Sequence, residues 1–169
     1  MSQIKLLPYS HNFIKHFENE KQKIEFVISE AKVYHIGSTA VEGLGGKVII
    51  DILVAIDDWN KKEVAVKKLK KIGFLHIHSE EGERIFLSRN KSAKPKNIHI
   101  HLVKTNNQAY IDLLLFRDYL RENKDEANEY MKFKQESIKM AKNDRIVYGN
   151  FKNKYIVSIL IKAKNNTQS

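Results

Sequence analysis

The segment Gly37-Ser38-Thr39, together with Lys47 further along the chain, has the residue types of a phosphate-binding loop. Gly37 lacks a Cβ, so a ligand can approach the backbone closely there. Ser38 and Thr39 offer hydroxyls and, at the start of a helix, backbone amides that bind anions. Lys47 comes after three more glycines and adds a positive charge. The spacing predicts a phosphate-binding turn, although an ordinary strand-to-helix turn with Ser38 as N-cap fits the same residues.

Asp51 is the only charged residue inside the apolar, β-branched run from Val48 to Ile56. Such a run is typical of a strand that is covered on both faces. Burying a lone carboxylate is costly unless it is paired or binds a metal ion. Asp51 is therefore a candidate catalytic and metal-binding residue. The alternatives are a structural ion pair with a buried arginine or a cap on a neighbouring turn.

Two histidines, His99 and His101, alternate with apolar residues in the run from Ile98 to Val103. Because the side chains of a strand alternate between its faces, both imidazoles are expected on one face. The pair can bind one ion, oxygen or phosphate, and Asp51 on another strand of the same sheet would supply a carboxylate. Two hydrogen-bonded histidines on a half-buried sheet face are the structural alternative.

Arg117 and Arg121 lie four residues apart in the run Phe-Arg-Asp-Tyr-Leu-Arg (116–121), so they share one face of a helix. Two arginines on one face suit phosphate binding, because guanidinium groups form charge-assisted hydrogen bonds with phosphate oxygens. A helix tethered by ion pairs, in which Asp118 reaches Arg121, accounts for the same spacing.

The charge of the chain points to an anionic partner. The formal net charge is +10 and the pI is near 9.6, which suits a nucleotide or another phosphorylated small molecule. The lysines are spread along the chain, so we do not expect a nucleic-acid partner. The absence of cysteine excludes disulfides and thiol chemistry. We expect a cytoplasmic protein without a membrane partner, because no apolar run is long enough for a signal peptide or a membrane span.

Hydrophobic periodicity divides the chain into a sheet-forming part and a helical part. A helix is predicted from Ser10 onward, and a second, lysine-rich helix at 64–72. Short apolar runs predict strands at 32–36, 48–56, 74–77, 84–88 and 98–103. A polar loop at 90–96 precedes the last strand, and three helices follow from Asn107.

This pattern predicts an α/β (α+β) fold, in which helices flank a mixed sheet of about four strands and the C-terminal third is helical. We expect one domain over residues 1–169. Its sheet core would span about 10–105 and its C-terminal helices about 107–164.

The run from His35 to Ile52 strongly resembles the signature of the GrpB family. The resemblance extends in the family's order to His99 and His101, to the run 116–121, and to two further pairs: Tyr130 with Lys134, and Tyr148 with Lys152. It covers nearly the whole chain. It implies the nucleotidyltransferase superfamily fold, and a similar domain is found fused to dephospho-coenzyme A kinase.

By the same resemblance, Gly37 and Ser38 occupy the glycine-serine position of the superfamily, and Asp51 its first metal-binding carboxylate. The chain departs from the superfamily pattern at Leu53, where a second carboxylate is usual. It also has Glu42 and Val48 where GrpB relatives often have prolines. The missing acid matters more, because paired carboxylates hold the ions used in nucleotidyl transfer.

The leading hypothesis is a metal-dependent nucleotidyltransferase that acts on a nucleoside triphosphate and an unidentified acceptor. Mg²⁺ or Mn²⁺ would be held by Asp51, His99 and His101, while Gly37, Ser38 and Lys47 bind the phosphates. His35 or one of the paired histidines would act as general base. The alternative is a catalytically degenerate accessory module that binds a nucleotide or a coenzyme A precursor. The sequence leaves the oligomeric state open.

Overall fold

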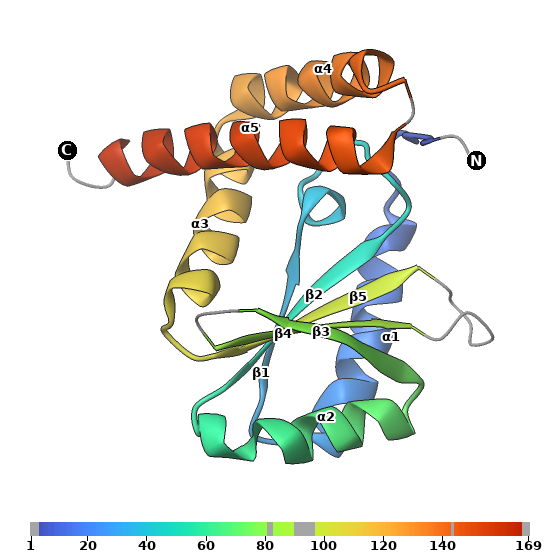
Figure 1. Ribbon diagram of the computed structural model, residues 1–169, viewed down its shortest axis with the longest axis vertical. Helices are drawn as coiled ribbons and strands as arrows, with labels where there is room; N and C mark the ends of the chain where they lie inside the picture. The colour runs from blue at the N-terminus through green and yellow to red at the C-terminus, as the bar shows by residue number, and fades with distance from the viewer. Residues whose placement is uncertain (1–3, 81–82, 90–96, 143, 167–169) are drawn as a thin grey trace.

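The computed structural model describes residues 4–80, 83–89, 97–142 and 144–166, so the predicted loop at 90–96 lies outside the described residues. A central sheet occupies the middle of the molecule (Figure 1). Helices cover one of its faces, and a separate helical layer lies at one end.

The sheet has five strands in the order β1-β2-β5-β4-β3, one more than the approximate number predicted. The strands are β1 (Lys32–Ile36), β2 (Ile50–Ile56), β3 (Phe74–Glu80), β4 (Arg84–Arg89) and β5 (Ile98–Lys104). β2 and β5 pair in parallel, and the other neighbours pair antiparallel. The prediction of a mixed sheet flanked by helices is therefore confirmed.

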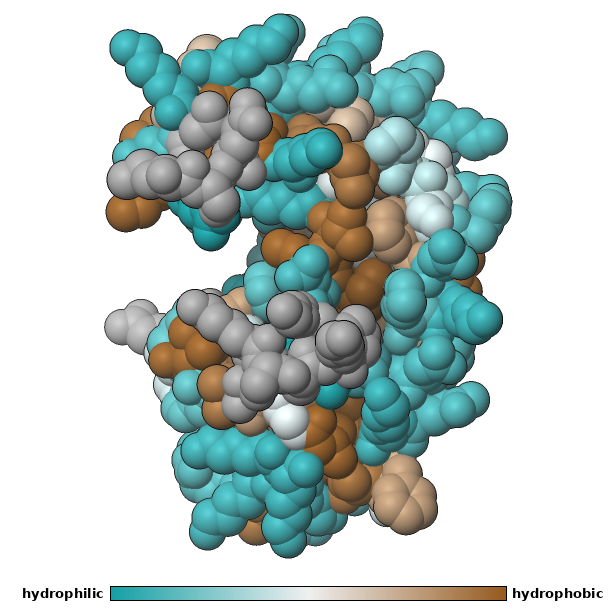
Figure 2. Space-filling model, turned by 90° about the vertical axis from the view of Figure 1, so that its right-hand side faces the viewer, coloured by the Kyte–Doolittle hydropathy of each residue, from teal (hydrophilic) through white to brown (hydrophobic). Residues whose placement is uncertain are grey.

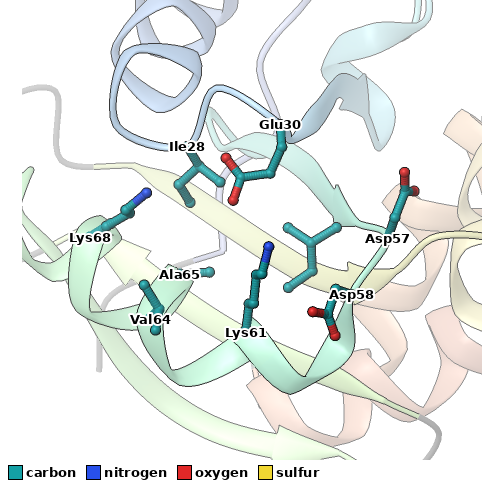
Figure 3. Close-up of a pocket in the computed structure, with 9 residues that line it drawn as sticks. Ile28, Glu30, Asp57, Asp58, Lys61, Val64, Ala65 and Lys68 are labelled. Atoms are coloured by element: carbon teal, nitrogen blue, oxygen red, sulfur yellow. The ribbon is translucent and has the colours of Figure 1, made fainter.

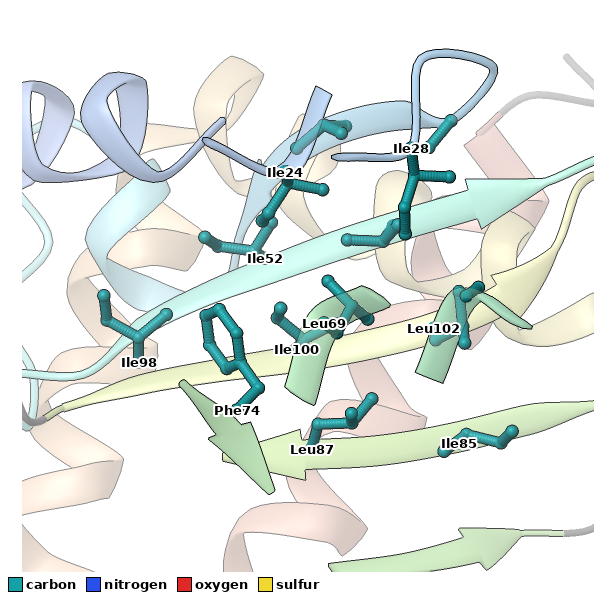
Figure 4. Packing of buried hydrophobic residues seen from close by; sticks show 14 of the residues in the cluster. Ile24, Ile28, Ile52, Leu69, Phe74, Ile85, Leu87, Ile98, Ile100 and Leu102 are labelled. Carbon is teal, nitrogen blue, oxygen red and sulfur yellow. The ribbon is translucent and has the colours of Figure 1, made fainter. Parts of the chain in front are cut away.

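One face of the sheet is a dry apolar core under α1 (Asn12–Val27) and α2 (Lys62–Lys71). Every second residue of β2 and β5 points into it, because strand side chains alternate between the two faces. Figure 4 shows these side chains packed together. The strand residues that are fully buried there include Ile52, Val54, Ile100 and Leu102.

The other face of the sheet meets the helical C-terminal part. This part consists of α3 (Gln108–Glu122), α4 (Lys124–Met140) and α5 (Arg145–Asn166), the three helices predicted from Asn107. The side chain of Asn107 caps α3 by accepting a hydrogen bond from the Tyr110 amide. α3 packs on Leu53 and Val103 and then leads away from the sheet, so that α4 and α5 lie beyond its end (Figure 1).

None of the described helices is both long enough and apolar enough to span a membrane.

Candidate functional site

A cleft of about 600 Å³ lies between the second face of the sheet and the C-terminal helices. Figure 2 shows the surface deeply hollowed between the sheet and the helical layer. Residues from segments far apart in the sequence line the cleft, among them Gly37, Ser38, Asp51, Arg84, His99, His101 and Lys152. The fold thus gathers four of the polar residues that the sequence singled out: Ser38, Asp51, His99 and His101.

Gly37 brings the loop after β1 against Asp51. Its φ angle of +71° lies in the left-handed region, which favours glycine. A Cβ at this position would lie 2.6 Å from Oδ2 of Asp51, so any side chain would collide with the carboxylate. Ser38 begins a short 3-10 helix (Ser38–Ala40) directly afterwards. The predicted strand-to-helix turn is therefore present, and it borders the cleft.

Asp51 lies between the two histidines of β5. Its Oδ1 atom is 3.4 Å from Nδ1 of His99 and 3.8 Å from Nε2 of His101. The parallel register pairs Asp51 with His99, which places these side chains on one face. Burial opposes ionisation of Asp51, but hydrogen bonds from the two histidines outweigh it and hold the pKa below its ordinary value. The carboxylate is therefore ionised at neutral pH.

Arg84 fixes the orientation of His101. Its Nη2 atom lies 2.7 Å from Nδ1 of His101. Because a guanidinium only donates hydrogen bonds, Nδ1 must accept, and the proton of the neutral ring then lies on Nε2, toward Asp51. Burial lowers the pKa of His101, so the ring is neutral at neutral pH. Both ring nitrogens of His101 are thereby occupied.

This arrangement does not fit the divalent ion predicted for Asp51, His99 and His101. One nitrogen of His101 faces Arg84 and the other carries a proton, so neither offers a lone pair to a metal. At the position of the usual second carboxylate, Leu53 is fully buried beneath α3. Within the ranges that the structure describes, no three side chains of His, Cys, Asp or Glu are grouped to hold a metal ion.

Three lysines adjoin the cleft, and the sequence assigned a site role only to Lys47. Nζ of Lys47 lies 4.3 Å from the centre of the Tyr148 ring. Nζ of Lys134 donates to Oγ of Ser38 at 3.2 Å and to the carbonyl of Gly45 at 2.6 Å. Lys152 lines both the cleft and a smaller hollow of about 50 Å³ beside it.

A sequence signal for Lys134 existed. Tyr130, Lys134 and Ile138 recur every four residues along α4, so the lysine interrupts an apolar stripe. A charged residue in such a stripe is buried when the helix packs, and Lys134 is only 2% exposed.

His35 and Thr39 do not line the cleft. His35 lies on the opposite face of β1, where its ring stacks on Phe17 of α1. Thr39 is buried, and its hydroxyl donates to the Ile49 carbonyl while it bonds Nε2 of His35. Nε2 therefore carries the imidazole proton, and burial lowers the pKa of His35 to about 4. This geometry does not support His35 as general base, nor Thr39 as a phosphate ligand.

Arg117 and Arg121 tie α3 to the segment around the Gly37-Ser38 turn. Arg117 donates to the His35 carbonyl at 3.1 Å and pairs with Asp118 through two hydrogen bonds. Arg121 donates to the Ala40 carbonyl at 2.9 Å. Neither guanidinium lines the cleft. The geometry favours the tethering alternative over phosphate binding by these two residues.

The surface is also hollowed away from the cleft, and two of these hollows border residues near the ends of β1 and β2. One, of about 730 Å³, lies on the α1 side of the Gly37-Ser38 turn and is bordered by His35 and Arg121. The second, of about 150 Å³, lies at the end of β2 between α1 and α2. Figure 3 shows Glu30 and Lys61 extending into it. Neither hollow includes Ser38 or Asp51.

The fold is that of the nucleotidyltransferases. The chain aligns with solved structures of Cid1, described as an RNA terminal uridylyl transferase, with a TM-score of 0.54 at 12% sequence identity. The alignment covers 77% of this chain and 42% of that structure. At this identity the likeness concerns the fold alone.

A family model described as GrpB protein matches residues 3–162, and the chain belongs to this family. The crystal structure of conserved protein GrpB from Enterococcus faecalis aligns over 98% of this chain and 100% of that one, with a TM-score of 0.85 and 27% identity. The glutamate-rich protein GrpB of Alkalihalophilus pseudofirmus is 30% identical over 161 residues, which is 92% of each chain. The resemblance in the sequence is thereby confirmed.

Proposed function

We propose that this protein binds a nucleoside triphosphate in the cleft and transfers its nucleoside monophosphate to an acceptor. One observation carries the proposal: the Gly37-Ser38 turn, the Asp51 carboxylate and the imidazole of His99 border one cleft beside a group of lysines. These are the parts that nucleotidyl transfer needs for holding phosphates and activating a hydroxyl. Solved Cid1 structures described as bound to MgATP and MgGTP share the fold.

His99 is the proposed general base. When Nδ1 of His99 donates to Asp51 across the 3.4 Å contact, its Nε2 atom is left with a lone pair. This nitrogen can take the proton of an acceptor hydroxyl as the hydroxyl oxygen attacks the α-phosphorus. The new oxygen–phosphorus bond forms while the bond to the departing pyrophosphate breaks. Asp51 orients the ring and stabilises the imidazolium that results.

The second candidate is a binding module that holds a nucleotide or a coenzyme A precursor without turning it over. The observation that favours it is the burial of Leu53 at the position of the second carboxylate. With one carboxylate already bonded to histidines, two ions cannot be placed in the usual way. Ligand binding would then be retained, and transfer would be absent.

The test follows radiolabel from the α-phosphate of each common nucleoside triphosphate into product. Small hydroxyl, phosphate and polypeptide acceptors would be screened with Mg²⁺, with Mn²⁺ and with neither ion. Asp51→Asn preserves the shape but removes the charge, and it should lower transfer by about 10²–10⁴-fold. Binding without transfer to any acceptor would favour the binding module. Absence of binding by every nucleotide would remove both candidates.

A further inference from the structure

Lys134 is a buried lysine whose ammonium group contacts neutral groups. Its Nζ atom bonds the Gly45 carbonyl and the Ser38 hydroxyl, and it lies 4.8 Å from the centre of the Tyr130 ring. The residue is 2% exposed. Across the described ranges, no carboxylate lies within ion-pair distance of it. A buried ammonium without a counter-ion is costly, so a negatively charged ligand would stabilise this position.

Two further lysines face the same space. Lys47 and Lys152 line the small hollow beside the cleft together with Lys134, and Ser38 and Asp51 lie at its junction with the cleft. Neither Lys47 nor Lys152 forms an ion pair with any carboxylate that the structure describes. Desolvation and the charge of Lys152 both lower the pKa values of Lys47 and Lys134, so the ammonium group of Lys152 repels each of the other two.

The one carboxylate at this junction already has histidine partners. Asp51 faces His99 and His101, and Arg84 lies behind His101. An empty site for Mg²⁺ would have carboxylates without partners, because Mg²⁺ is bound by oxygen ligands. Here the three lysines around the junction outnumber the one carboxylate. A negatively charged ligand would balance this excess of positive charge.

We propose that Lys47, Lys134 and Lys152 bind the triphosphate chain of the nucleotide directly and replace the divalent ions that usually neutralise it. The ligand class is a nucleoside triphosphate in its metal-free form, with inorganic tripolyphosphate as its minimal mimic. Ser38 lines the same hollow and offers its hydroxyl to the phosphates. This inference rests on the proposed function for the location of the nucleotide, and it adds how the phosphate charge is neutralised.

The experiment measures binding by isothermal titration calorimetry with ATP, UTP and inorganic tripolyphosphate. Each is titrated in EDTA and again with excess Mg²⁺. We expect binding in EDTA to be at least as tight as with Mg²⁺, because a bound ion neutralises charge that the lysines recognise. Lys134→Met and Lys152→Met should each weaken binding in EDTA by tenfold or more. Lys67→Met removes an exposed lysine of α2 as a matched control and should leave the affinity unchanged.

The outcomes separate this inference from the proposed function. Binding that requires Mg²⁺ would overturn the lysine inference and leave nucleotide binding standing. Unchanged affinity in both Lys134→Met and Lys152→Met would also overturn it. Because Lys152 is partly exposed, its variant gives a clear result even if Lys134→Met folds poorly. If no ligand binds in either condition, the proposed function fails together with the inference.

Discussion

The two faces of the central sheet carry different chemistry although the same strands build both. Ile52, Ile100 and Leu102 point to the α1 side and are fully buried. Their neighbours Asp51 and His99 point to the cleft, and 26% and 31% of their side-chain surface is exposed. A slip of one residue between β2 and β5 would exchange these sets. The apolar face therefore fixes the register that brings the polar residues together.

The largest expected effect separates the two faces of the sheet through two adjacent residues of β5. Ile100→Ala should lower the free energy of unfolding by about 2–5 kcal/mol, because it leaves a cavity in the apolar core. His99→Ala should change it by less than about 1 kcal/mol and, under the proposed function, should abolish transfer, because the proposed base is lost. Urea denaturation and the labelled-phosphate assay measure the two effects. Similar losses of stability in both variants would contradict the separation of the faces.

Acid should lower the stability of the protein through His35, which packs on the α1 side of the sheet. Its pKa falls from 6.5 to about 4 on folding, so the unfolded chain binds a proton that the folded chain excludes. Stability from this residue is complete above pH 6.5 and falls as the pH drops toward 4, by about 2 kcal/mol between pH 7 and pH 5. His101 contributes with the same sign. Denaturant titrations should show a shallower pH dependence in His35→Gln, and an unchanged slope would contradict this account.

The two arginine tethers should differ in strength. The Arg117 side chain is 13% exposed and holds a carbonyl of β1, so Arg117→Ala should cost about 1–2 kcal/mol of unfolding free energy. The Arg121 side chain is 44% exposed, and Arg121→Ala should cost less than about 1 kcal/mol. Thermal and urea denaturation would rank the two variants. Equal and negligible losses would show that this helix face is merely solvated.

A small change in stability is also expected at Lys134. Lys134→Met should shift the free energy of unfolding by no more than about 1 kcal/mol, because the lost hydrogen bonds are offset by relief from burying a charge. Burial and the charge of Lys152 lower the pKa of Lys134 to about 7. Tripolyphosphate affinity should therefore fall as the pH rises through 7, since the ammonium loses its proton. Calorimetry at several pH values should show that this affinity depends less on pH in Lys134→Met than in the wild type. Identical pH profiles in the two proteins would show that Lys134 does not bind tripolyphosphate.

Much of the fold could be predicted because its signals are local. The alternation around His99 and His101 placed both on one face, and the apolar run around Asp51 identified a central strand. The face on which His35 lies could not be predicted, since a strand covered on both sides shows no apolar alternation. The contact between Lys134 and Ser38 joins residues 96 positions apart, so it depends on how α4 packs. The bond from Arg84 to His101 likewise depends on strand pairing.

The central claim is that the cleft face binds triphosphate at the Gly37-Ser38 turn, and amide hydrogen exchange tests it most directly. Exchange would be compared with and without saturating tripolyphosphate in EDTA. We predict slower exchange at Gly37, Ser38 and the glycine loop at 43–46, while the core amides of β2 and β5 remain unchanged. Protection confined to the hollow beside α1, or to surface lysines such as Lys67, would contradict the account.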